Sequence, residues 1–197
     1  MVDAPRALID AQLFAWHQEA AGYKIRHVPA GLPDMVKIRP MLEWEYAPSL
    51  GHTIDLAIAS AEDRLNWMRQ AQSDYEIALP LHELQGFARA EGYYRGCPKQ
   101  IRIEQLKHLA RLTEQLYPVM WICLFDARKI YSSPITIFGP LRAVIYLGQQ
   151  YLVLRVPDRI QALSQQFDGL IRAAEIGTRD LPAIIDALLR ELDATAD

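Results

Sequence analysis

The spacing of the apolar residues changes near Pro118, and this change restricts the possible folds more than any other feature. Before it, apolar residues recur at helical spacing, and in the segment 54–69 they step by four and three positions along one stripe. After it come four short apolar runs, rich in β-branched and aromatic residues, at 119–125, 135–138, 144–147 and 151–156. Short runs divided by turn sequences are typical of an antiparallel meander and not of βαβ crossovers.

Helical patterns come before and after these strands. We expect helices over 5–22, 54–69, 82–90, 98–117, 159–176 and 181–192, and one earlier strand over 74–79. Amphipathic helices and a short-stranded sheet bury their apolar faces against each other. The sequence therefore predicts an α+β fold, in which amphipathic helices cover one face of a small, mostly antiparallel sheet of about five strands.

The segment before residue 53 is rich in proline between Pro29 and Pro48. Each proline disfavours helix at the residue before it, so we expect only short helices there, at Asp34–Ile38 or Met41–Tyr46. We therefore divide the chain into residues 1–52, an N-terminal helix with a proline-rich connecting segment packed on the main domain, and residues 53–197, the α+β domain.

Composition limits the classes of function. The chain has 197 residues, of which 51% are hydrophobic and 23% charged, as in soluble globular proteins. With 21 Lys and Arg against 24 Asp and Glu, it has no global basic field to hold nucleic acid or an anionic membrane. The N-terminus does not have the pattern of a signal peptide, and no apolar run is long enough to cross a bilayer. We expect a cytoplasmic protein.

Patterns that carry catalysis or bind cofactors are missing from the sequence. The histidines lack metal-ligand spacing, and neither a GxSxG nucleophile motif nor a glycine-rich phosphate loop is present. Cys123 lies in an apolar run and is expected to be a buried, unreactive thiol, whereas Cys97 lies in a loop and is expected to be more accessible. We therefore expect no catalytic residues, no metal and no cofactor. The alternative is an enzyme, a hydrolase or transferase, in which Cys97, His82 or His108 meets a carboxylate from a distant segment.

Aromatic residues at and near the strand ends suggest a binding site. Rings with a polar tip often line pockets for small organic ligands, although they also fill cores. The residues that we expect to form a pocket wall are Trp121, Tyr131, Tyr146 and Tyr151.

Three motifs follow one another in a recognisable order: EQL with HLA at 104–110, YLGQQY at 146–151, and FDGL with AA at 167–174. In this order they resemble the C-terminal effector half of bacterial Xre-type (Cro/cI-like) helix–turn–helix transcriptional regulators. The resemblance covers roughly residues 55–189 and identifies residues 53–197 as the effector domain.

The resemblance implies a module that senses a small-molecule or protein effector and forms a homodimer. It defines no catalytic residue, and it implies that DNA is contacted only through a helix–turn–helix domain that is absent from this chain. The apolar stripe of the last helix, at Leu181, Ile185, Leu188 and Leu189, is a candidate dimer face or part of the core. A further alternative is an antitoxin-like protein-interaction module, which would present an exposed apolar patch instead of a pocket.

Overall fold

The computed structural model describes residues 6–50, 54–70, 73–147 and 150–194. Its helices are α1 (Arg6–Glu19), α2 (Arg39–Leu50), α3 (Ile54–Arg69), α4 (Leu81–Arg89), α5 (Lys99–Gln115), α6 (Pro157–Ala173) and α7 (Leu181–Ala194), with short 3-10 helices η1 (Asp34–Val36) and η3 (Gly92–Tyr94). Its strands are β1 (Ile25–Val28), β2 (Tyr75–Pro80), β3 (Met120–Phe125), β4 (Ile135–Phe138), β5 (Arg142–Tyr146) and β6 (Tyr151–Leu154). The predicted α+β class is confirmed, with six strands where about five were expected.

The strands form one sheet in the order β3-β2-β1-β4-β5-β6. β4, β5 and β6 are the predicted antiparallel meander, and β1 joins it antiparallel to β4. β3 departs from the prediction because it pairs parallel with β2, which in turn pairs parallel with β1. α4 and α5 lie between β2 and β3 in the chain, and such a helical connection is what a parallel pair requires.

β1 is the strand that the sequence did not indicate. It has only four residues, directly before a proline-rich stretch, and two of them, Arg26 and His27, are polar. It nevertheless lies in the middle of the sheet, where Ile25 and Val28 are buried and His27 Nδ1 lies 2.9 Å from Thr136 Oγ1. Burial between two neighbouring strands outweighs a weak local preference, as it commonly does in strands.

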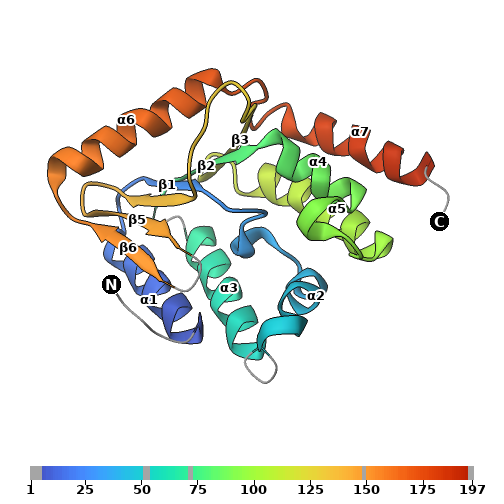
Figure 1. Cartoon of the computed structure of the whole chain (residues 1–197), viewed down its shortest axis with the longest axis horizontal. Helices are drawn as coiled ribbons and strands as arrows, with labels where there is room; N and C mark the ends of the chain where they lie inside the picture. The colour runs from blue at the N-terminus through green and yellow to red at the C-terminus, as the bar shows by residue number, and fades with distance from the viewer. Residues whose placement is uncertain (1–5, 51–53, 71–72, 148–149, 195–197) are drawn as a thin grey trace.

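Helices cover both faces of the sheet, which corrects the prediction of a single covered face. Figure 1 shows α6 on one side of β5 and β6, and α1 on the other. On the face that we call the major face, side chains of α1, α2, α3, α4, α5 and α7 form the large core with the sheet. On the other, the α6 face, the helix α6 packs on a smaller core through Ile160, Phe167 and Leu170.

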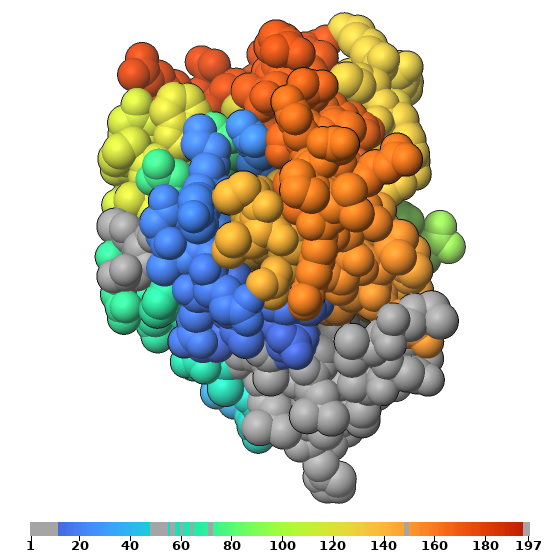
Figure 2. Space-filling view, turned by 90° about the vertical axis from the view of Figure 1, so that its left-hand side faces the viewer, coloured from blue at the N-terminus to red at the C-terminus, as the bar shows by residue number. Residues whose placement is uncertain are grey.

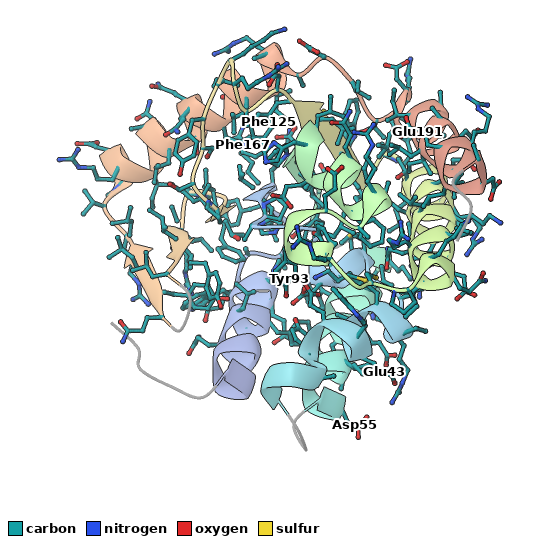
Figure 3. All side chains as sticks on the ribbon, turned by 45° about the vertical axis from the view of Figure 1, so that its right-hand side comes forward. Glu43, Asp55, Tyr93, Phe125, Phe167 and Glu191 are labelled. Atoms are coloured by element: carbon teal, nitrogen blue, oxygen red, sulfur yellow. The ribbon has the colours of Figure 1, made fainter. Side chains whose placement is uncertain are left out.

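Alternation along the strands explains how the two faces arise. In β2, Ile77 belongs to the core of the major face and the next residue, Ala78, belongs to the core of the α6 face. In β3, Leu124 and Phe125 divide in the same way. Figure 3 shows Phe125 beside Phe167 of α6. These strands are apolar on both sides, so they need cover on both sides.

The last helix belongs to the large core. Leu181, Ile185, Leu188 and Leu192 of α7 are buried there, and Leu189 is partly buried against it. The stripe considered above as a dimer face therefore packs inside the protein. Within the described ranges, no helix has both the length and the hydropathy needed to cross a bilayer.

Candidate functional site

A cavity of 140 Å³ lies on the α6 face, between α6, the 131–133 loop and the strands β4 and β5. Its lining is Tyr131, Ser132, Ser133, Ile135, Ile145, Leu163, Gln166, Phe167 and Leu170. The strands and the apolar stripe of α6 supply aliphatic and aromatic side chains, whereas the loop and Gln166 supply hydroxyl and amide groups. The described lining includes no charged residue, so the cavity suits an uncharged guest.

The strand register explains the floor of this cavity. Ile135 of β4 and Ile145 of β5 are directly opposite each other across the antiparallel pair, so both side chains point to the α6 face. On α6, Leu163, Phe167 and Leu170 follow at intervals of four and three, which places them on one side of the helix. The sequence pattern of α6 was therefore interpreted correctly, but the cavity that it helps to form could not be inferred from that pattern.

A charged contact at the sheet centre holds α6 at this place. Arg26 of β1 donates from Nη2 to Asp168 Oδ1 of α6 at 3.0 Å, and its guanidinium carbon lies 5.9 Å from the centre of the Phe167 ring. Arg26 also donates from Nε to Glu76 of β2 at 3.3 Å. Since Asp168 follows Phe167 directly, this contact fixes the part of α6 that lines the cavity.

The polar side of the cavity is formed by Ser132 and Ser133, directly before Pro134. The Tyr131 hydroxyl oxygen lies 3.4 Å from Ser133 Oγ, and Ser132 Oγ donates to the Ser133 carbonyl at 3.0 Å. Tyr131 is 73% exposed, so its ring stands at the rim. Of the four aromatic residues expected to line a pocket, Tyr131 is the one that the structure places at this cavity.

Tyr146 and Tyr151 lie close to each other but on the major face. Because Ile145 points into the cavity, the next residue, Tyr146, must point to the opposite side of the sheet. Its ring centre is 5.4 Å from that of Tyr151, which in turn packs at 5.8 Å against Trp16 of α1. These two tyrosines therefore complete the packing between the meander and α1.

Trp121 lies on β3, three strands away from β4 across the sheet. It is 41% exposed, and its ring centre is 5.6 Å from that of Tyr117, over which the guanidinium of Arg179 lies at 6.0 Å. The four aromatic residues therefore do not form one pocket wall: one lies at the cavity, two pack against α1, and Trp121 lies at the β3 edge. Ser132, Ser133 and Gln166 are the polar cavity residues that the sequence analysis missed.

The two cysteines are both buried, free thiols. Cys97 was expected to be the more accessible, but it is 3% exposed against 7% for Cys123. Burial raises the pKa of the Cys97 thiol to about 11, and its Sγ lies 3.9 Å from Met41 Sδ. Burial raises the pKa of Cys123 as well. A thiol that stays protonated at neutral pH is a poor nucleophile.

The two histidines considered for catalysis lie apart from these thiols in the chain. His82 is on the first turn of α4, exposed, with Nε2 3.5 Å from Glu83 Oε1. His108 is half-buried on α5; burial lowers its pKa, and the charges of Arg111 and Arg69 lower it further. Among the residues that the structure describes, none lies within hydrogen-bond distance of its Nε2. The contact of His82 is with its sequence neighbour, not with the carboxylate from a distant segment that the enzyme alternative requires.

The most deeply buried charge belongs to Lys37. Its Nζ donates to Asp34 at 2.8 Å and to Glu45, and the Tyr46 hydroxyl donates to Asp34. Burial alone would lower the pKa of Lys37, but the charges and hydrogen bonds of Asp34 and Glu45 raise it above its ordinary value. These contacts join η1 to α2, and we assign the group a structural role.

Groups that could support other chemistry are scarce among the described residues. In the parts of the chain that the structure covers, no three His, Cys, Asp or Glu side chains are grouped so that they could hold a metal ion. No protein-family model, no curated protein and no solved structure matches the chain. The cavity under α6 is therefore the feature on which a functional proposal can be built.

Proposed function

We propose that this chain is the ligand-sensing and self-associating module of a bacterial transcriptional regulator, with no catalytic activity of its own. The neutral cavity between α6 and the meander is the observation that carries the proposal. The order of the motifs at 104–110, 146–151 and 167–174, which resembles Xre-type effector halves, adds the regulatory context. On this proposal the chain works in the cytoplasm and contacts DNA through a separate helix–turn–helix domain.

The cavity favours a small, uncharged and largely apolar ligand. Its volume of 140 Å³ is close to that of engineered apolar cavities of about 150 Å³ that accept benzene. Burying an ionised group without a partner of opposite charge is costly, and the described lining offers no such partner. The hydroxyl groups of Tyr131, Ser132 and Ser133 suit one hydroxyl or carbonyl group on the ligand. Phenol is a simple compound with these properties.

The position of α6 suggests how occupancy could be transmitted. Two residues separate the end of β6 from the start of α6, and after its last residue the chain passes to the edge of β3, where Ile176 bridges to Leu124. A ligand between α6 and β5 acts on the protein only so far as it binds one arrangement of α6 better than another. The same helix therefore connects the ligand to both edges of the sheet.

Thermal unfolding in the presence of matched small molecules tests this proposal. We expect phenol to stabilise the chain, by about 2.7 kcal/mol at a concentration one hundred times its dissociation constant, and benzoate, its charged counterpart, not to do so. The variant Leu163→Trp fills the cavity and should abolish the effect of phenol. Ala162→Trp adds the same side chain at the neighbouring, exposed position of α6 and should keep the effect.

Two outcomes would count against the proposal. The first is that phenol stabilises Leu163→Trp as strongly as the wild-type protein, which would place the binding outside the cavity. The second is that neither phenol nor any compound of a neutral metabolite library shifts the unfolding temperature, while the purified chain turns over a substrate. That result would favour the enzyme alternative.

A further inference from the structure

The two edges of the sheet differ in whether another segment of the chain bonds to them. At the β3 edge, the segment after α6 covers the strand: Leu124 donates its N–H to the Ile176 carbonyl at 2.9 Å, and Ile122 donates its N–H to Thr178 Oγ1 at 2.7 Å. At the other edge, no strand among the described residues pairs with the outer side of β6. An open edge invites pairing with another chain.

The hydrogen-bond pattern identifies which backbone groups of β6 face outward. Leu147 donates its N–H to the Gln150 carbonyl at 2.8 Å, so these two residues form a hydrogen-bonded pair of the β5–β6 ladder. Such pairs alternate with pairs that make no ladder bond, and Ile145–Leu152 is the next hydrogen-bonded pair. Val153, opposite Val144, therefore directs its N–H and C=O away from β5.

Charge and proline, two of the usual protections of an edge strand, are missing from most of this hairpin. From Ala143 to Leu154 the sequence contains no Asp, Glu, Lys, Arg or Pro, whereas edge strands commonly carry charge or proline. Leu152 is 43% exposed, and Leu147 and Val156 beside it are exposed as well. Figure 2 looks onto this side of the molecule, where the orange surface of the segment from β6 into α6 lies next to the blue surface of α1.

We propose that the outer edge of β6 pairs with β6 of a second copy of this chain, antiparallel and about a two-fold axis at Val153. The inference specifies the interface for the self-association in the proposed function and rests on that part of it. In this register the two Val153 residues exchange N–H···O=C bonds, and Leu152 lies opposite Leu154 of the second copy. The result is one continuous sheet through both copies.

A second copy fits this edge for reasons of charge and symmetry. The uncharged β6 strands of two copies meet without like-charge repulsion, and the antiparallel order of β4, β5 and β6 continues across a two-fold axis. The uncharged stretch is followed by exposed charges of both signs, at Arg155, Asp158 and Arg159. These charges provide a polar rim around the apolar centre of the interface.

The interface would also be coupled to the cavity. Leu152 is opposite Ile145, which lines the cavity, and β6 continues into α6 through Arg155 and Val156. A ligand that moves α6 would therefore alter the edge presented to the second copy.

Sedimentation of the ligand-free chain tests the interface without reference to any ligand. We expect a dimer at about 100 µM, and we expect Leu152→Lys to weaken dimerisation at least tenfold. Trp121→Lys is the matched control: it places the same charge at an exposed aromatic residue on the opposite, already covered edge, and should leave dimerisation unchanged. Backbone amide exchange of Val153 should become slower as the protein concentration rises, because its N–H is bonded only in the dimer.

Disulfide formation tests the register. A mixture of Leu152→Cys and Leu154→Cys chains should form a disulfide-linked heterodimer, since the two positions face each other as a pair without ladder bonds, while neither variant should crosslink alone. Crosslinking of Leu152→Cys by itself would overturn the register.

A monomer at 100 µM would overturn the interface, and so would a dimer that Leu152→Lys leaves intact. Slow exchange of the Val153 amide in a dilute monomer would mean that the chain covers its own edge, which also overturns it. A phenol-binding monomer would refute this interface and leave the ligand-binding part of the proposed function standing.

Discussion

The two faces of the sheet differ in how completely they are packed. On the major face, six helices bury a large core, and the buried charge of Lys37 is matched by the carboxylates of Asp34 and Glu45. On the α6 face, one helix covers a smaller core and leaves a cavity between itself and the meander. The cavity opens to solvent beside the exposed Tyr131, Ser133 and Gln166, so the single helix leaves an accessible recess in the α6 face.

The difference suggests that the two faces have different roles. A face held by many helices resists local change, whereas one helix fixed at few points can move with little cost to the rest of the protein. The major face then serves stability, and the α6 face serves the proposed binding. Substitutions on each face test this division.

Removal of a partner from Lys37 should be the most damaging change. Glu45→Ala leaves a buried ammonium with one carboxylate instead of two, and breaking a buried ion pair typically costs about 3–5 kcal/mol. The control is Glu43→Ala, which removes a carboxylate from the same helix but from an exposed pair with Arg39, and should cost less than about 1 kcal/mol. Urea unfolding followed by circular dichroism measures both. Equal losses would show that Lys37 is not enclosed as described.

Two buried phenylalanines compare the faces directly. Phe87 of α4 lies in the large core and Phe167 of α6 lines the cavity, and both are almost fully buried. Phe87→Ala should cost about 3–5 kcal/mol, and Phe167→Ala about 1 kcal/mol less, because its site is already incompletely packed and can collapse more easily. Urea unfolding of both variants at one pH gives the difference. A larger loss for Phe167→Ala would reverse the comparison.

Sequence reasoning predicted the major face better than the α6 face, and the reason is physical. The stripe in 54–69 and the last helix have strong helical periodicity, and each was found where it was expected. Periodicity identifies an amphipathic helix, but not the side of the sheet on which it packs. The same stripe of α6 fits either face, and the sequence analysis placed it with the other helices.

The strand errors have a similar origin. Whether a strand pairs in parallel or antiparallel depends on which strand lies beside it. The sequence of β3 does not indicate that β2 is its neighbour. β1 was missed because Arg26 and His27 look like loop residues until their partners Asp168 and Thr136, more than 100 positions away, are known. The cavity residues Ser132 and Ser133 suggest a turn, and only the position of α6 above them makes that turn part of a site.

The point where the chain passes from one face to the other should respond to a smaller change. After α6, the chain turns around the β3 edge to α7, and there Thr178 Oγ1 accepts from the Ile122 N–H at 2.7 Å and donates to the Ile122 carbonyl at 2.9 Å. Thr178→Val keeps the shape but leaves both buried groups of Ile122 unpaired, at a cost of about 1–3 kcal/mol. Thr178→Ser should retain most of the stability, and hydrogen exchange at Ile122 should rise in the valine variant alone. Unchanged exchange there would mean that another group covers this edge.

The smallest expected effect is a pH dependence of the free energy of unfolding that comes from His108 of α5. Burial, with the charges of Arg111 and Arg69, lowers the pKa of His108 in the folded protein below its ordinary value of 6.5. Below about pH 6.5 the unfolded chain therefore binds a proton that the folded chain resists, so the free energy of unfolding should fall as the pH drops through this range. His108→Gln, which cannot take up the proton, should flatten this part of the profile. If the wild-type and His108→Gln profiles run parallel between pH 7 and pH 5, the imidazole is not shielded from solvent and the acid sensitivity of the protein originates elsewhere.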